Sequence, residues 1–298
     1  MIRLGYACIN TVLPTTSKTC RLANATPERV VALGRQNLLA LAEILRWNQA
    51  QGIGVFRISS EIIPLASHPA VRGIPWAQEL EVELAQAAAV IRASGARVSM
   101  HPGQYTVLNS PRIEVVEASL AEMDYHARLL DLLGTGQDAK IILHLGGVYG
   151  DKAAAMARFA RSFGLLSASA QARLVLENDE KSYTTADALA LSAETGSPVV
   201  FDVFHHTYNR SLDDLSLRAL IERCAATWSV LDAPAKLHYS DQWAGKPPGS
   251  HSQSVDLDAF GRFYETIHGM DVDVMLEVKD KEQSVLALYQ RFPELRLP

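Results

Sequence analysis

The chain has 298 residues, of which 48% are hydrophobic and 20% charged, as expected of a globular protein with a sizeable core. Its 28 Lys and Arg residues against 33 Asp and Glu residues give a formal net charge of −5, so composition offers no overall basic surface for nucleic acid. No apolar run approaches the roughly 18 to 20 residues of a membrane helix, and the N-terminal residues turn polar too early for a signal peptide.

Short apolar runs alternate with longer segments in which apolar residues recur every three or four positions. The short runs are rich in Val, Ile, Leu and Phe, and they predict buried strands at 2–7, 54–59, 96–100, 139–144, 172–177, 198–202, 235–240 and 273–278. The longer segments predict helices at about 25–52, 75–94, 113–133, 151–163, 184–194, 212–227, 256–268 and 280–292.

The order of these elements predicts the fold class. Eight strands, each followed by a helix, imply a parallel sheet, and this number matches a (β/α)8 TIM barrel formed as a single domain by residues 1–298. A doubly wound open sheet is the alternative. The sequence contains neither a G-x-G-x-x-G motif nor a Walker-type loop, so the usual nucleotide-binding reasons for an open sheet are missing.

Polar residues mark the ends of six consecutive predicted strands. In a TIM barrel the catalytic groups lie at the C-terminal ends of the strands, and the residues found there are His101, His144, Glu177, Asp202, His238 and Glu277. A carboxylate within an apolar run, such as Glu177 or Glu277, is costly to bury without a partner. Bound cations would account for the whole set; the alternative is an accidental ring of polar strand ends.

Imidazoles combined with carboxylates suit Zn²⁺ or Mn²⁺. Six strands supply more ligands than one ion uses, so we expect at least two ions with Glu177 as a bridging ligand. His205 and His251 could hold a third ion, although His251 lies in the polar loop PPGSHSQS and a solvent-exposed histidine is the alternative there. His68 follows the second strand and could contact a substrate phosphate.

Two or three neighbouring cations can clamp a phosphate, generate hydroxide near neutral pH and stabilise a leaving oxygen. The cluster therefore predicts phosphodiester hydrolysis. Barrels with two metals at the rim also isomerise sugars, so a metal-dependent sugar isomerase or epimerase is the alternative enzyme. A metal-stabilised binding protein without catalytic activity is the third interpretation.

Several motifs resemble those of the UV damage endonuclease family. They are HPGQY (101–105), LENDE (176–180), FDVFHH (201–206), KLHYSD (236–241) and LEVKDKE (276–282). RLGYACIN (3–10), KTCRLAN (18–24) and RISSEIIPLASH (57–68) are also similar, so the resemblance covers nearly the whole chain in order. That family belongs to a superfamily of barrels that includes apurinic-site endonucleases and xylose isomerase.

The resemblance implies a DNA repair nuclease with up to three metal ions, usually Mn²⁺, with Zn²⁺, Co²⁺ or Mg²⁺ as other options. Such an enzyme would cut UV-damaged double-stranded DNA immediately 5′ to cyclobutane pyrimidine dimers, 6-4 photoproducts and some other lesions, leaving a 3′-hydroxyl and a 5′-phosphate. The implied metal ligands are His101, His144, Glu177, Asp202, His205, His238, His251 and Glu277.

The resemblance also implies how DNA is recognised. Gln104 and Tyr105 would probe the duplex at the lesion, while Tyr6 and Asn10 would face the damaged nucleotides. Lys236 shares a strand face with His238 and could meet a phosphate or carry a modification on its amine. The expected catalytic set is thus Glu177, Glu277, His238, Lys236 and His68, and the cations expected to hold the DNA strands are Lys18, Arg21, Arg57 and Lys246.

The expected location follows from the cysteines and the substrate. Cys8, Cys20 and Cys224 are odd in number and scattered, which predicts free thiols in a reducing cytoplasm. An enzyme of this kind would associate with the nucleoid when it acts on DNA. Neither a membrane nor an obligate protein partner is expected.

Overall fold

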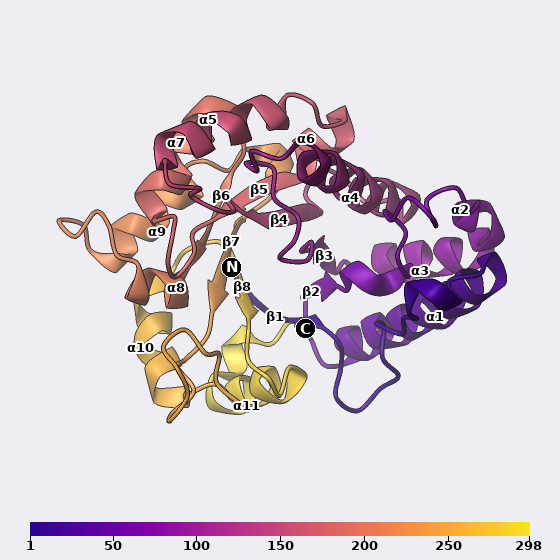
Figure 1. Cartoon of the computed structure of the whole chain (residues 1–298). Helices are drawn as coiled ribbons and strands as arrows, with labels where there is room; N and C mark the ends of the chain where they lie inside the picture. Colours follow the sequence, from indigo (N-terminus) through magenta and orange to yellow (C-terminus); the bar gives the residue numbers. More distant parts are fainter.

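The computed structural model describes residues 1–298 and contains a closed barrel of eight parallel strands (Figure 1). Each strand pairs with the next along the chain, and the last strand pairs back with the first. The strands are β1 (Ile2–Cys8), β2 (Val55–Ile58), β3 (Arg97–Met100), β4 (Lys140–His144), β5 (Leu174–Glu177), β6 (Val199–Asp202), β7 (Ala235–Tyr239) and β8 (Val272–Leu276). The predicted (β/α)8 barrel is confirmed, and the open sheet is excluded.

Helices surround the barrel in Figure 1, and 64 buried residues form the main hydrophobic cluster. The helices are α1 (Pro27–Ala50), α2 (Trp76–Glu79), α3 (Glu81–Ser94), α4 (Ile113–Leu132), α5 (Lys152–Phe163), α6 (Ala168–Arg173), α7 (Thr185–Thr195), α8 (Val203–Tyr208), α9 (Leu217–Ala225), α10 (Leu257–Ile267) and α11 (Glu282–Arg291). Short 3-10 turns lie at Leu22–Asn24, Ser60–Ile62, Val230–Asp232 and Pro293–Leu295. None of the helices combines the length and the hydropathy needed to cross a lipid bilayer.

Three predicted elements differ from those in the structure. The helix expected at 75–94 is divided at Leu80 into α2 and α3, and the helix expected at 212–227 begins only at Leu217, after its capping residue Ser216. The strand expected at 172–177 begins at Leu174, because the preceding residues form α6. The short helix α8 was not predicted; it begins directly after β6, where the Asp202 side chain accepts a hydrogen bond from the His205 backbone amide.

The barrel interior consists of three layers of side chains. At the bottom, Asp273 accepts hydrogen bonds from Arg3 Nε at 2.7 Å and from Arg97 Nη1 at 2.6 Å. Above it lie small apolar clusters made of Ala7, Val55 and Met275 and of Ile142, Val175 and Val200. The polar strand ends form the third layer. Asp273 is the common partner of two arginines at the bottom, and the polar groups at the top are a separate set.

Candidate metal centre

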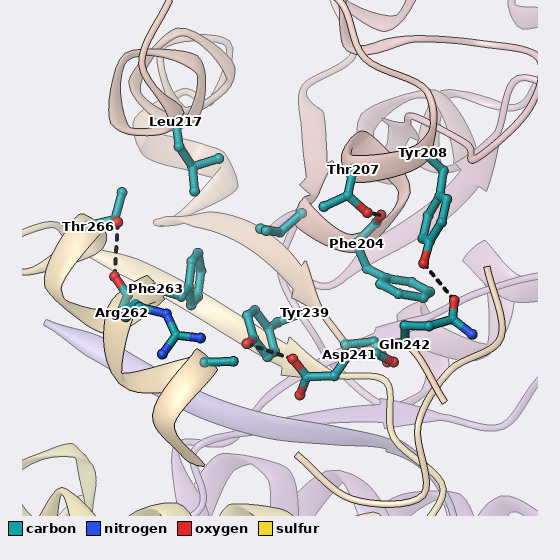
Figure 2. Close-up of a pocket in the computed structure, with 13 residues that line it drawn as sticks. Phe204, Thr207, Tyr208, Leu217, Tyr239, Asp241, Gln242, Arg262, Phe263 and Thr266 are labelled. Carbon is teal, nitrogen blue, oxygen red and sulfur yellow. Dashed lines mark hydrogen bonds between the residues drawn. The ribbon is translucent and has the colours of Figure 1, made fainter. Parts of the chain in front are cut away.

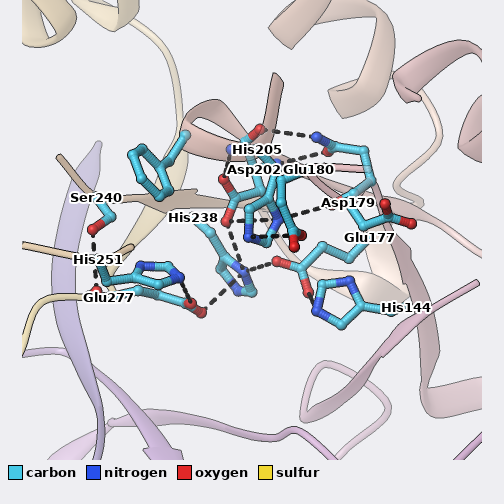
Figure 3. A network of polar contacts seen from close by, with 12 residues as sticks. His144, Glu177, Asp179, Glu180, Asp202, His205, His238, Ser240, His251 and Glu277 are labelled. Atoms are coloured by element: carbon cyan, nitrogen blue, oxygen red, sulfur yellow. Dashed lines mark hydrogen bonds and ion pairs between the residues drawn. The ribbon is translucent and has the colours of Figure 1, made fainter. Parts of the chain in front are cut away.

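The polar strand ends meet because the strands are parallel and end at one rim. His144 lies beside Glu177 in the β4–β5 register, and Asp202 lies beside His238 in the β6–β7 register. Figure 3 shows their side chains pointing toward one another. Glu177, Asp202 and His238 are almost fully buried, with at most 1% of each residue exposed.

Glu177 lies between two groups of potential metal ligands. One group combines it with His101 and His144 and the other with Asp202 and His238, and within each group the donor atoms lie within 4.8 Å of one another. Its Oε2 atom is 3.1 Å from His101 Nε2. The same atom is 3.5 Å from His144 Nε2, while its Oε1 atom contacts His238 Nδ1 (Figure 3). A carboxylate shared in this way has the position of a bridging ligand.

The remaining expected ligands extend this cluster towards α8 and β8. The His205 ring centroid is 5.6 Å from that of His144 and 5.9 Å from that of His251. Glu277, the first residue after β8, places Oε1 3.2 Å from His238 Nδ1 and Oε2 3.9 Å from His251 Nε2. The structure therefore brings all eight expected ligands into one continuous cluster.

The electrostatics of the cluster favour bound cations. Burial opposes ionisation of Glu177, but the neighbouring His238, His144 and His101 side chains hold its pKa well below the ordinary value. Burial, reinforced by the Glu177 and Glu277 carboxylates, holds the pKa of Asp202 well above the ordinary value. Buried carboxylates this close together cannot all ionise unless cations compensate them.

Unpartnered polar atoms lead to the same conclusion. Asp202 Oδ2, His144 Nδ1 and His251 Nδ1 are buried and have no hydrogen-bond partner. Buried polar groups in folded proteins are normally satisfied, so atoms left free in a cluster of this chemistry suit ligands of a metal. The donor set of imidazoles and carboxylates thus fits divalent ions such as Mn²⁺ or Zn²⁺.

Two supporting residues in the centre were not assigned these roles from the sequence. Arg57 was expected on the DNA-holding surface, but its side chain is buried and Nη2 lies 2.5 Å from Glu277 Oε1 and 2.8 Å from His238 Nε2. Asn178 Nδ2 donates to the Asp202 carbonyl at 3.0 Å and Oδ1 accepts from the Asp202 amide at 2.9 Å. An arginine inside the apolar strand 55–58 was the available signal for Arg57.

An aromatic hollow of about 430 Å³ lies beside the cluster, between α8, α9 and α10 (Figure 2). Phe204 lines it and also packs on His251, with ring centroids 5.1 Å apart. Tyr208 donates a hydrogen bond of 2.6 Å to Gln242, which pairs with His251 through an isolated antiparallel bridge. These contacts hold the 242–251 loop so that His251 faces the centre.

The HPGQY loop leads from the centre to the surface. Tyr105 is 84% exposed, and the turn that contains it closes with a 2.9 Å hydrogen bond from the Thr106 amide to the Gly103 carbonyl. Gln104 lines a cavity of about 290 Å³ together with the expected metal ligands His101 and His144. The two residues expected to probe DNA thus occupy the exposed tip of a loop that starts at the metal centre.

Tyr6 and Asn10 are not at the rim surface, contrary to the expectation that they face damaged nucleotides. Successive side chains of a strand point to opposite faces, and Tyr6 points outward from the barrel towards α1. Its hydroxyl donates to Asn48 Oδ1 at 2.7 Å and accepts from Asn10 Nδ2 at 2.9 Å. Asn10 Oδ1 in turn accepts from the Val12 amide, so these side chains shape the loop after β1.

Lys236 and His68 also lie apart from the ligands. Lys236 is fully buried one layer below His238; its Nζ has no hydrogen bond and lies 3.7 Å from Asp273 Oδ2. Burial lowers the pKa of this amine to about 7, even though Asp273 opposes the shift. His68 Nδ1 accepts a 3.2 Å hydrogen bond from the Ala70 amide, and no hydrogen bond or ion pair joins His68 to the cluster.

Known proteins resemble the chain over its whole length. A UV DNA damage endonuclease of Clostridium perfringens is 39% identical over 99% of the chain and 71% of its own length. A UV-damage endonuclease of Neurospora crassa is 36% identical over 97% of the chain, which spans only 51% of that relative. The crystal structure of SacUVDE superposes with a TM-score of 0.93 at 39% identity, covering 100% of both chains.

The sequence model of the family described as UV-endonuclease UvdE matches residues 2–297. This match and the relatives above confirm the resemblance first seen in the motifs of the rim. The chain belongs to the UV-endonuclease UvdE family.

Proposed function

We propose that residues 1–298 form one DNA repair endonuclease domain, which hydrolyses the phosphodiester bond immediately 5′ to UV photoproducts. The products would be a 3′-hydroxyl and a 5′-phosphate. The observation that carries this proposal is Glu177, a buried carboxylate shared by two donor groups at the open rim of a barrel of this family. The relatives' names, which refer to UV damage in DNA, support the choice of substrate.

The eight clustered side chains would hold up to three divalent ions, with Mn²⁺ as the first choice. Bound there, such ions supply Lewis acidity that activates water and offsets charge on a phosphate. Arg57 adds a fixed positive charge, which orients the Glu277 carboxylate through the 2.5 Å hydrogen bond. Asn178 fixes the backbone of Asp202, so this ligand is held in place before a substrate arrives.

The other expected catalytic residues act from outside the ligand set. Lys236 is enclosed in the barrel, so we assign it a role in positioning His238 from below. His68 lies on the loop after β2, and we assign it a contact with a DNA phosphate. Its imidazole Nε2 is free for that contact, because the hydrogen bond from Ala70 uses Nδ1.

Recognition of the lesion would come from the exposed tip of the HPGQY loop. Tyr105 can stack on a base, and Gln104 can hydrogen-bond to one. A damaged step is already poorly stacked, so opening it costs less than opening an intact step. Tyr6 and Asn10 would act indirectly, because they shape the loop after β1 from within.

The test is nicking of a duplex in the presence of Mn²⁺, with irradiated and intact duplexes of the same sequence compared. We expect cuts only in the irradiated duplex, on the 5′ side of the photoproduct. Glu177→Gln should abolish cutting and reduce the number of ions bound per chain, because two donor groups lose their shared carboxylate. Glu83→Gln is the matched control, since Glu83 forms an ion pair with Arg35 between the outer helices α3 and α1 and is not part of the ligand cluster.

Three results would contradict the proposal. Equal nicking of both duplexes would show that the enzyme is not specific for the lesion. Aldose–ketose interconversion without nicking would favour the sugar isomerase. Firm metal binding with neither activity would favour a binding protein.

A further inference from the structure

The loop that follows β4 carries a second exposed aromatic side chain at the rim. Its sequence from 145 to 151 is LGGVYGD, and Tyr149 in this loop is 48% exposed. The backbone of Tyr149 has φ of 54°, in the left-handed region that bulky residues seldom adopt, between Gly146 at 95° and Gly150 at 79°. Such a conformation persists where the surroundings impose it, and it concentrates at binding sites.

Buried side chains hold this loop in place. The Gly147 carbonyl accepts hydrogen bonds from Asn109 Nδ2 at 2.8 Å and from the Tyr183 hydroxyl at 3.0 Å. Asn109 and Tyr183 are both fully buried. A side chain at Gly146 would place its Cβ 2.5 Å from Asn109 Oδ1, so the loop can pack this closely only with glycine there.

The Tyr149 ring itself rests on fixed groups. A Cβ at Gly147 would lie 2.9 Å from Tyr149 Cζ, so the ring packs directly against the Gly147 backbone. The Arg158 guanidinium lies 5.5 Å from the ring centroid. Arg158 Nε donates a 2.8 Å hydrogen bond to the Asn109 carbonyl, which fixes the cation relative to the ring. The ring is therefore held in position while nearly half of the residue faces solvent.

The position of the loop connects Tyr149 with the metal centre. Gly146 and Gly147 line the cavity of about 290 Å³ that His101, His144 and Gln104 also line. Tyr149 does not line the cavity itself, but its ring packs against Gly147, which does. The loop after β4 therefore carries an exposed ring directly behind a residue that lines the cavity, and the HPGQY loop carries the exposed Tyr105 on the β3 side.

We infer that Tyr149 is a stacking platform for a nucleobase of the damaged strand, next to the phosphodiester bond that is cut. This inference rests on the proposed function. Base stacking on an aromatic ring tolerates any sequence, as an enzyme that follows lesions requires. A ring that is fixed before binding loses little conformational freedom when the base stacks. Arg158 behind the ring adds a positive charge close to the strand.

The experiment uses the Mn²⁺-loaded enzyme and a photoproduct duplex whose cleavable bond carries a phosphorothioate. 2-Aminopurine is placed in turn at each position flanking that bond, and its fluorescence falls where it stacks. We expect quenching by the wild-type enzyme at one position close to the bond. Tyr149→Ala should remove this quenching and weaken binding about 5- to 150-fold, the range for one lost base–aromatic stack.

Matched variants separate stacking from a structural role. Tyr149→Phe and Tyr149→Trp should keep the quenching, because both retain a ring. Gly147→Ala should reduce it, since the added Cβ displaces the Tyr149 ring. Leu165→Ala, at an exposed apolar residue after α5, should leave it unchanged. Bound metal and the thermal unfolding midpoint, measured on every variant, should match the wild type.

Unchanged quenching and affinity in Tyr149→Ala would overturn the inference. The proposed function would still stand in that case if the wild type nicks the irradiated duplex. Loss of metal or of folding in Tyr149→Ala that Tyr149→Phe does not share would instead make the ring structural and also overturn it. Failure of the wild type to nick irradiated duplex is the separate outcome that removes the proposed function, and the inference with it.

Discussion

Asn178 shows how a residue outside the ligand set can determine how tightly the centre binds metal. Its side-chain amide forms two hydrogen bonds with the backbone of Asp202, at 3.0 and 2.9 Å, and its own carbonyl accepts from His205 Nδ1 at 3.0 Å. Two of the expected ligands are thus oriented by one residue. Outer partners of this kind tune a metal site almost as strongly as the ligands do.

We therefore predict that Asn178→Ala lowers the affinity for Mn²⁺ about 10- to 100-fold without changing the number of sites. The reason is that the Asp202 backbone loses both hydrogen bonds to the Asn178 side chain, whereas the backbone carbonyl that accepts from His205 remains. Isothermal titration with Mn²⁺ measures both quantities. Asn24→Ala, in the short turn Leu22–Asn24, is the control. An unchanged affinity, or loss of a whole site, would contradict the prediction.

At the scale of elements, the ends of the strands were predictable and the direction of single side chains was not. Parallel strands end at one rim, so the positions of His101, His144 and Glu177 along the chain were enough to bring them together. Tyr6 points outward and Lys236 lies one layer down because side chains alternate along a strand. If the predicted start of a strand is wrong by one residue, every side chain of that strand is assigned to the opposite face of the sheet.

Packing between elements explains what else the sequence did not reveal. The short helices α6 and α8 have six residues each, too few for a clear 3.6-residue period. Their starts depend on single capping side chains, Ser167 and Asp202. Arg57 was misplaced on the DNA surface because its partner Glu277 lies 220 residues further along the chain. Such contacts depend on the closed barrel and cannot be predicted from the local sequence.

The bottom of the barrel yields a prediction about pH. Lys140, on β4, is fully buried and donates a short hydrogen bond to Asp232, which precedes β7. Burial alone would raise the pKa of Asp232, but the hydrogen bonds from Lys140 and Ser229 lower it below the ordinary 3.8. An acid with a lowered pKa stabilises the folded state above its ordinary pKa, and this contribution is lost as the pH falls through the folded value.

Asp232→Asn should accordingly lower the free energy of unfolding by about 3 to 5 kcal/mol at pH 7, because the buried Lys140 ammonium loses its counter-charge. The difference from the wild type should shrink below pH 3.8, where the wild-type carboxylate becomes protonated too. Urea unfolding at a series of pH values measures this. Asp213→Asn, at an exposed ion pair with Arg210, serves as the control. A difference that stays constant with pH would refute the prediction.

For the whole molecule, the metal cluster links the strands from β3 to β8 and should stabilise the barrel. Ions that bind only the folded chain raise its stability, by about 2.7 kcal/mol when the free ion is at 100 times its Kd. We predict that the thermal unfolding midpoint rises with Mn²⁺ and falls after chelation. In Glu177→Gln the difference between the two conditions should be reduced, because both donor groups are incomplete. An unfolding midpoint that is the same with Mn²⁺ and after chelation would mean that the cluster binds no ion.

The net charge of −5 makes the binding of DNA a question of local charge. Cations at the rim and arginines close to it would have to contact the phosphates, and each such contact releases counterions. We predict that the logarithm of the affinity falls linearly with the logarithm of the salt concentration, with a slope near −0.9 per phosphate contact. Fluorescence anisotropy with a photoproduct duplex measures the slope. An affinity that does not change with salt concentration would exclude a groove that contacts the DNA phosphates.

Closure of the barrel by β1 and β8 has a consequence for the chain while it is being made. Of the eight strands, Ile2–Cys8 is synthesised first, but it gains its second neighbour only when Val272–Leu276 has been synthesised. Every expected ligand except Glu277 precedes that strand, so most of the donors are synthesised before the barrel can close. Contacts this distant in sequence form late in folding. The domain would therefore become competent only in its final steps of folding, after β8 has been synthesised.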